Sequence, residues 1–300
     1  MITGVFVGGT SGIGRAMAQA FARHTNGNAH IVIIGRNKIA AAELIASFPK
    51  ADTNAIHEFI PCDVSLITNV HHTTSELARR LQRIDYLVLS SGILIFAGRN
   101  ETSEGLDDKM ALSYYSRWTF IHDLMPLMQK SERGAKVYSI LAAGANSPIE
   151  KDNLDLRKNH TFGKMTAALT TYTNVAFQVN LFTYDHILNK ITLLEQKFAK
   201  EEPNRSFNHA FPGFVRSPML TPSTWYWKIP YYLVYPIFSF ISVTPEVSGD
   251  IHFAALLESP PGFHSYNPKG KLMQYKPAEE ETVDIVWEHT LELTERLHEH

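Results

Sequence analysis

Residues 2–16, ITGVFVGGTSGIGRA, join an apolar segment to a glycine-rich loop and then to the start of an amphipathic segment. The apolar residues up to Val7 predict a buried strand, and glycines at 8, 9, 12 and 14 follow it directly. Glycine lets the backbone turn tightly and approach a pyrophosphate, while a helix beginning there offers unpaired N–H groups and a positive dipole end. The stretch therefore predicts the first strand, phosphate-binding loop and helix of a dinucleotide-binding fold.

Strand-like and helix-like segments alternate along most of the chain. Apolar runs typical of strands buried on both faces occur at 31–34, 59–60, 86–89, 137–141 and 207–211. Segments with apolar residues at helical spacing occur at 17–23, 40–48, 70–81, 106–128, from 167 onwards, and near 245–257 and 279–297. This alternation predicts an α/β fold, a Rossmann-type doubly wound parallel sheet, in a single domain spanning residues 1–300.

The composition bears on the class of partner and on location. The 28 Lys and Arg residues nearly balance the 30 Asp and Glu residues, which gives a formal net charge of −2 and argues against nucleic acid. The single cysteine, Cys62, and an N-terminus that enters a strand at once favour a cytoplasmic protein. An apolar stretch at 225–243 is interrupted by Lys228, Pro230 and Pro236, so we expect no transmembrane segment.

The spacing of Gly8, Gly12 and Gly14 differs from the commoner GxGxxG pattern. It resembles the TGxxxGxG fingerprint of the short-chain dehydrogenase/reductase family, with Val7 in place of the threonine. We expect a side chain at Gly14 to block the approach of the backbone to a pyrophosphate and to abolish dinucleotide binding. The alternative is a strand-to-helix turn that needs glycines only for its geometry.

Arg36 distinguishes between the two nicotinamide cofactors. It follows Gly35 at the end of the second predicted strand, where an acidic residue would bind the ribose hydroxyl of NAD. An arginine suits the 2′-phosphate of NADP instead. Arg15, beside the glycine loop, adds to this preference unless it is an ordinary solvated helix residue. The sequence therefore predicts NADP.

Three later segments resemble cofactor-binding segments of the same family. Asp63 and Val64 close the third predicted strand as the adenine-contacting pair does, and LSSG at 89–92 resembles a degenerate NNAG turn. PGFVRS at 212–217 resembles the PGxVxT segment, whose hydroxyl residue holds the nicotinamide carboxamide. The cofactor-binding residues that the resemblance implies are Gly8, Thr10, Ser11, Gly12, Ile13, Gly14, Arg15, Arg36, Asp63, Val64, Ser91, Gly92, Pro212, Gly213, Val215 and Ser217.

The catalytic residues depart from the family pattern. Family members use an Asn, Ser, Tyr, Lys set, in which the tyrosine exchanges a proton and the lysine lowers its pKa. Ser113 falls at the asparagine position and Ala142 at the serine position, and no YxxxK lies between the fifth strand and the PGFVRS segment. His160 and Lys164 keep a lysine one helical turn after an imidazole, unless His160 is an ordinary helix-start histidine. Tyr184 is the alternative proton donor.

The chain resembles a divergent fungal-type branch of the family in which the catalytic set is commonly eroded. The segments that carry this resemblance are VYSILAAG at 137–144, NLDLRKNHT at 153–161 and FNHAFPGFVRSPM at 207–219. An insertion at 179–194 is expected to lengthen the helix that follows the fifth strand. The resemblance implies an oxidoreductase and does not establish turnover.

A proline- and aromatic-rich insert at 218–243 predicts a flap over the crevice at the carboxyl ends of the strands. Its aromatic side chains suit a bulky apolar substrate, such as a secondary metabolite of the polyketide, terpenoid, steroid or lipid type. Core packing or a dimer surface in a homo-oligomer is the alternative use of these residues. Peripheral membrane attachment through the flap is a third.

We therefore expect an NADP-dependent oxidoreductase that interconverts a carbonyl and an alcohol on a bulky apolar substrate. The competing hypothesis is a catalytically impaired NADP-binding protein that serves as a partner or sensor. Loss of the usual catalytic set favours the impaired-binder hypothesis. The cofactor motifs do not distinguish the two hypotheses, because both require them.

Overall fold

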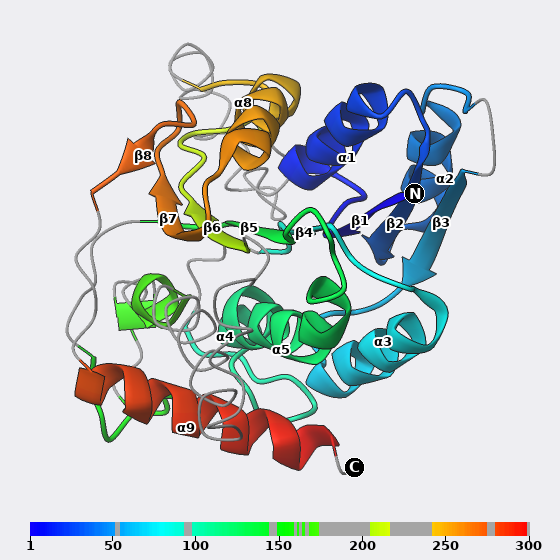
Figure 1. The fold of residues 1–300 in the computed structure, drawn as a ribbon. Coiled ribbons are helices and arrows are strands. Elements are labelled where there is room, and N and C mark those ends of the chain that lie inside the picture. Colours follow the sequence, from blue (N-terminus) through cyan, green and yellow to red (C-terminus); the bar gives the residue numbers. More distant parts are fainter. Residues whose placement is uncertain are drawn as a thin grey trace, which may run out of the picture.

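The computed structural model shows a twisted sheet with helices on both sides (Figure 1). The structure describes residues 1–51, 55–92, 98–143, 149–158, 161, 164–165, 168–173, 205–216, 242–274 and 280–298. Within these ranges, eight strands form one sheet in the order β3-β2-β1-β4-β5-β6-β7-β8. Neighbouring strands are parallel except β7 and β8, which are antiparallel. The predicted α/β class and doubly wound sheet are confirmed.

The strands lie close to the apolar runs of the sequence. Their bounds are β1 (Ile2–Val7), β2 (Ala29–Gly35), β3 (Ile56–Pro61), β4 (Tyr86–Leu89), β5 (Lys136–Ile140), β6 (Ser206–Ala210), β7 (Gly262–Tyr266) and β8 (Leu272–Met273). Strands β1 to β6 match the predicted segments to within a few residues. The sequence did not predict β7 and β8, because GFHSY of β7 mixes apolar and polar residues and β8 has two residues.

Helices cover both faces of the sheet. Their bounds are α1 (Gly12–His24), α2 (Lys38–Ala46), α3 (Ile67–Arg80), α4 (Asp108–Met110), α5 (Ser116–Met128), α8 (Pro245–Glu258) and α9 (Glu280–His298). In Figure 1, α1, α2 and α8 lie on one face, and α3, α5 and α9 lie on the other. The helical segment expected at 106–128 is divided, because a π-helical turn at Ala111–Tyr115 separates α4 from α5.

The core has two halves, one on each face of the sheet. Successive side chains of a strand point to opposite faces, so Val5 and Val7 pack with the layer of α3 and α5, while Phe6 packs with α1. Gly249 of α8 approaches α1 so closely that a Cβ on it would lie 2.4 Å from Cβ of Ala16. This contact presses α8 against the helix that follows the glycine loop.

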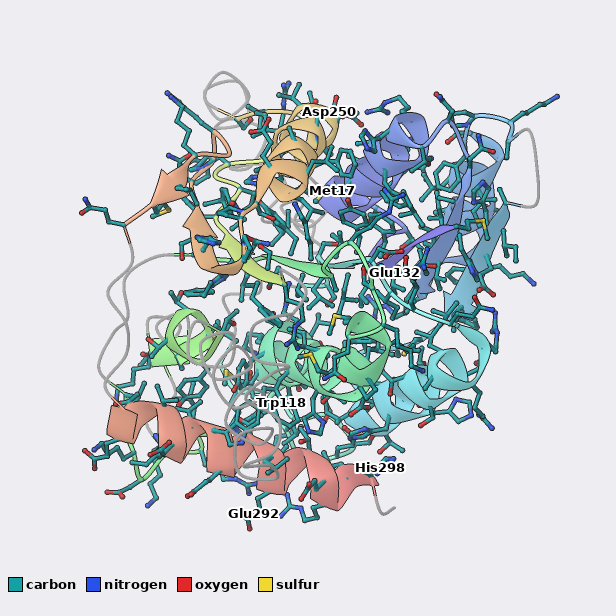
Figure 2. The ribbon with its side chains drawn as sticks, in the orientation of Figure 1. Met17, Trp118, Glu132, Asp250, Glu292 and His298 are labelled. Carbon is teal, nitrogen blue, oxygen red and sulfur yellow. The ribbon has the colours of Figure 1, made fainter. Side chains whose placement is uncertain are left out.

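Helix α9 forms a further layer outside α5. The Tyr115 hydroxyl lies 3.0 Å from Nε2 of His289 on α9. The ring of Trp118, labelled in Figure 2, meets that of Trp287 at a centroid distance of 5.4 Å. Helix α5 is therefore enclosed between the sheet and α9, which explains why its side chains are buried on most sides.

Parts of the predicted site lie outside the described residues, namely His160, Tyr184, Ser217 and residues 218–241 of the predicted flap. The two ends of the flap segment are described. The backbone N–H of Arg216 donates to the carbonyl of Val243 at 2.9 Å, so these ends lie side by side near the carboxyl end of β6. Of the helices that the structure describes, none has the length and apolar character of a membrane span.

Candidate functional site

The strand order predicts a crevice beside β1 and β4. Strand β1 leads into α1 on one face of the sheet, whereas the chain after β4 leads into α4 and α5 on the other face (Figure 1). Connections that leave neighbouring parallel strands toward opposite faces open a crevice outside the carboxyl ends of the strands, where open α/β sheets bind ligands. The candidate site is therefore built from the residues that follow the carboxyl ends of these strands.

The glycine loop after β1 forms a cradle with little room for side chains. Gly8 and Gly12 have φ values of +77° and +56°, a backbone conformation that favours glycine. A Cβ on Gly8 would lie 2.6 Å from the backbone nitrogen of Ser91, so the loop touches the chain that leaves β4. Within the described part of the chain, the Ser11 side chain does not cap α1. The first-turn N–H groups remain for an anion, which fits a pyrophosphate.

Gly14 joins the loop to α1 by close packing. A Cβ on Gly14 would lie 2.0 Å from Oγ of Ser90 and 2.8 Å from the carbonyl oxygen of Gly8. A side chain here would therefore first push α1 away from the loop and from the end of β4. Thr10 makes a similar contact with β2, since a Cβ on Gly35 would lie 3.0 Å from its Cγ2. Ile13 packs against the core on the α1 face.

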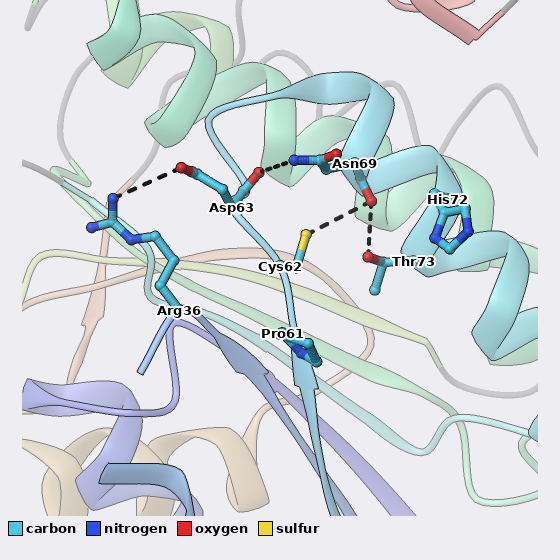
Figure 3. Close-up of a pocket in the computed structure, with 7 residues that line it drawn as sticks. All are labelled: Arg36, Pro61, Cys62, Asp63, Asn69, His72 and Thr73. Carbon is cyan, nitrogen blue, oxygen red and sulfur yellow. Dashed lines mark hydrogen bonds and ion pairs between the residues drawn. The ribbon is translucent and has the colours of Figure 1, made fainter. Parts of the chain in front are cut away.

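Arg36 and Asp63 stand at the carboxyl ends of β2 and β3. Nη1 of Arg36 lies 4.0 Å from Oδ2 of Asp63, and the Arg36 side chain is 75% exposed. Both residues line an open pocket of about 320 Å³ (Figure 3), together with Pro61, Cys62, Asn69, His72 and Thr73. The guanidinium can therefore turn toward a ligand phosphate at little cost in lost contacts.

Arg15 and Val64, two other predicted cofactor residues, take part in packing. Nη1 of Arg15 donates to the carbonyl of Ala40 at 3.0 Å, which ties α1 to α2. The side chain of Val64 is buried in the core. A contact from Val64 to a cofactor would therefore come through its backbone.

The chain after β4 and after β6 lines the other half of the crevice. Ser91 is buried, and its hydroxyl donates to the carbonyl of Leu112 at 3.4 Å. Gly92 is the last described residue before the gap at 93–97. Gly213, after Pro212, has a φ value of +72°. Val215 forms an isolated parallel bridge with Val243.

Arg117 of α5 is buried beneath the carboxyl ends of β4 and β5. Its side chain donates to the carbonyl of Leu89 at 2.7 Å, the hydroxyl of Ser139 at 2.5 Å and the carbonyl of Ile140 at 3.0 Å, and also to the carbonyl of Ser91. Burial lowers the pKa of this guanidinium to about 9. The bonds hold the ends of two neighbouring strands together at the edge of the crevice.

Sequence reasoning missed Arg117, although a signal was present. Phe120, Ile121 and Leu124 follow it at three-, four- and seven-residue spacing, so the arginine lies on the apolar face of its helix. A cation on such a face is buried only when its hydrogen bonds are satisfied inside the protein. The pattern indicated that Arg117 makes polar interactions within the core, but it did not reveal which atoms accept its hydrogen bonds.

The described catalytic candidates do not form a complete proton-transfer set. Ser113 is buried within the π-helical turn. Ala142 follows the end of β5, and its carbonyl accepts a bond from the Thr170 hydroxyl at 2.9 Å, so the helical residues 168–173 approach the expected place. Nζ of Lys164 bonds to the carboxylate of Glu150. The bond from Lys164 lowers the pKa of Glu150.

Comparison with known proteins agrees with this geometry. A family model described as enoyl-(acyl carrier protein) reductase matches residues 7–153. Oxidoreductase andH of Emericella variicolor is 31% identical over 264 residues, which cover 87% of this chain and 71% of that protein. Oxidoreductase AN1596 of Emericella nidulans is 32% identical over 257 residues, with 84% and 70% covered. The chain belongs to the short-chain dehydrogenase/reductase family.

Solved structures of lower identity share the short-chain dehydrogenase/reductase fold. The RhlG–NADP complex of Pseudomonas aeruginosa is 18% identical, with a TM-score of 0.56 over 90% of this chain and 95% of that chain. The alcohol dehydrogenase of Thermococcus sibiricus, solved with 5-hydroxy-NADP, is 15% identical, with a TM-score of 0.55 over 93% and 99%. The fungal relatives and the shared fold agree with the resemblance found in the sequence. The present chain is therefore an oxidoreductase-type protein of this family.

Proposed function

We propose that the protein is an NADP-dependent oxidoreductase that interconverts a carbonyl and an alcohol on a bulky apolar substrate. The observation that carries the choice of cofactor is Arg36, which stands exposed at the end of β2 directly after Gly35. NADP supplies or accepts the hydride when it is bound. The glycine cradle fits its pyrophosphate, and the Arg36 guanidinium would pair with its 2′-phosphate.

The substrate class rests on the aromatic insert at 218–241 and on what surrounds its ends. Phe211 and Phe214, which follow β6, are 40% and 61% exposed. They expose apolar side chains beside an insert whose sequence is itself rich in aromatic residues. This arrangement supports a bulky apolar substrate over a small polar one.

The cofactor proposal is tested by titrating NADPH and NADH by fluorescence into the wild type and Arg36→Ala. Loss of a charge-assisted phosphate contact is typically worth about 1.5–3 kcal/mol, so we expect NADPH affinity to fall about 10- to 100-fold and NADH affinity to change little. Arg79→Ala removes another exposed cation, from the last turn of α3, and serves as the matched control. Equal wild-type affinities for the two cofactors would overturn the NADP assignment.

We place the proton-exchanging group on the segment that begins near His160. If the HxxxK pair replaces YxxxK, His160→Ala and Lys164→Ala should lower the catalytic rate by about 10²- to 10⁴-fold while NADPH affinity is kept. If the insertion shifts the helix, Tyr184→Phe should show that loss instead. Full activity in all three variants would exclude these three residues as the source of the proton.

The second candidate function is an impaired NADP-binding protein that acts as a partner or sensor. Two observations favour it. Ala142 brings no hydroxyl to the end of β5, and Lys164 is held by Glu150. A panel of apolar carbonyl substrates with NADPH consumption as the readout separates the two functions, because a binder would retain NADPH affinity without turnover.

A further inference from the structure

The buried guanidinium of Arg117 brings a positive charge to the crevice without a paired carboxylate among its four hydrogen-bond partners. These partners are the carbonyls of Leu89, Ser91 and Ile140 and the hydroxyl of Ser139, all of them neutral oxygens. The side chain is 2% exposed. Carbonyl dipoles stabilise the charge but do not cancel it, so its field extends beyond the bonds that hold it.

The position of this charge relative to the cofactor crevice follows from the sheet. Leu89 and Ile140 are the last residues of β4 and β5, which are neighbours in the sheet. Ser91, which also accepts from Arg117, touches the glycine loop at Gly8. The guanidinium therefore lies under the strand ends that border the crevice, next to the loop that would hold the pyrophosphate.

His209 of β6 lies beside the strand position to which Arg117 bonds. His209 is fully buried beside Ser139 in the strand pairing. Burial lowers the pKa of His209 to about 3, and the positive charge of Arg117 adds to the effect. The imidazole is therefore neutral at physiological pH, and Arg117 supplies the charge of this cluster.

We propose that Arg117 makes the site select the reduced cofactor. The inference rests on the proposed NADP-dependent function. An oxidised nicotinamide ring carries a positive charge and a reduced ring carries none, so a fixed cation below the crevice repels the first and leaves the second unaffected. In a mixture of the two forms the protein would carry NADPH, which suits reduction of a carbonyl. Arg117 is thus a positioning residue that acts through its field and does not touch the substrate.

The size of the preference follows from Coulomb's law. For a nicotinamide ring bound roughly 10 Å from the guanidinium, at an effective dielectric constant of about 20, the repulsion would weaken the affinity for the oxidised form by about tenfold. We therefore expect the dissociation constant of NADP⁺ to exceed that of NADPH by about tenfold in the wild type. The pyrophosphate is common to both forms of the cofactor, so the effect of Arg117 on it should cancel from the ratio of the two dissociation constants.

The experiment measures three dissociation constants by calorimetry at neutral pH: NADPH, NADP⁺ and 2′-phospho-ADP-ribose, which lacks the nicotinamide. Arg117→Lys keeps the charge and should keep the tenfold ratio. Arg117→Gln removes it and should bring the ratio close to one. Ser139→Asp retains Arg117 and places a carboxylate beside its Nη1 atom, which should also bring the ratio close to one. 2′-Phospho-ADP-ribose carries the same pyrophosphate as NADPH, so in every variant that folds by circular dichroism its affinity should change by the same factor as that of NADPH.

Equal affinities of the wild type for NADPH and NADP⁺ would overturn the proposal without any variant. A ratio of the NADP⁺ to the NADPH dissociation constant that stays near tenfold in either Arg117→Gln or Ser139→Asp would also overturn it. One of these two variants is enough for the decision, provided that it folds. Failure of the proposed function has a different signature, because then none of the three ligands would bind. Binding of 2′-phospho-ADP-ribose without redox selection would refute only the role of Arg117.

Discussion

Gly14→Ala tests whether the glycine loop is held by packing between α1 and the end of β4. The new Cβ would lie 2.0 Å from Oγ of Ser90 and 2.8 Å from the carbonyl oxygen of Gly8. The contact with Ser90 involves a side chain, which the substitution Ser90→Ala can shorten. The contact with Gly8 involves the backbone, which no substitution removes. The pair Gly14→Ala and Ser90→Ala therefore forms a double-mutant cycle that isolates one of the two overlaps.

The expected magnitudes come from these contacts. Overpacking of this severity costs up to about 3 kcal/mol, and replacing a helical glycine by alanine returns up to about 1 kcal/mol, so Gly14→Ala should lower the unfolding free energy by about 2 kcal/mol. Ser90→Ala loses the 3.0 Å bond from its hydroxyl to the Val7 carbonyl, worth about 1 kcal/mol. Independent effects would sum to about 3 kcal/mol. We expect the double variant to lose no more than about 2 kcal/mol, because its Oγ overlap is gone.

Urea unfolding followed by circular dichroism measures the four unfolding free energies, and NADPH fluorescence titration of the same proteins reports on the loop. The Gly14→Ala variant should bind NADPH more weakly, and the double variant should regain part of that loss. Additivity of the two substitutions to within about 0.5 kcal/mol would refute the packing argument, as would a net stabilisation by Gly14→Ala.

Three further predictions concern stability. Burial lowers the pKa of His252 from 6.5 to about 4. Between these two pH values the imidazole is therefore protonated in the unfolded chain and neutral in the folded chain. His252→Gln should reduce the loss of unfolding free energy on acidification by about 1.4 kcal/mol per pH unit in that range, measured by urea unfolding. Burial alone would raise the pKa of Asp123, yet hydrogen bonds, including one from His71, hold it below its usual value. Asp123→Asn should therefore cost about 3 kcal/mol at pH 7, and thermal scans should show the loss shrinking as the pH falls below about 4. Gly249→Val should separate α8 from α1 and lower the melting temperature, and Ala16→Gly in the same chain should restore part of it.

The local patterns of the sequence determined the glycine-loop corner between β1 and α1 of this protein. The glycines at 8, 12 and 14 between an apolar run and a helix, and Arg36 after Gly35, depend on backbone conformation and on neighbours in the chain. Strands β1, β2 and β4 were likewise predictable, because nearly all of their residues are buried and most are apolar. These features are decided within a few residues of one another.

Only the tertiary structure decided what the apolar face of α5 encloses. Arg117 reaches four oxygens at the ends of two strands, and Tyr115 and Trp118 meet α9, more than 160 residues away along the chain. The role of Gly14 as a packing contact with Ser90 also needed the structure. Such partners come together only when the strands and helices are assembled, because a spacing pattern shows which face of a helix is buried and not which atoms it meets there.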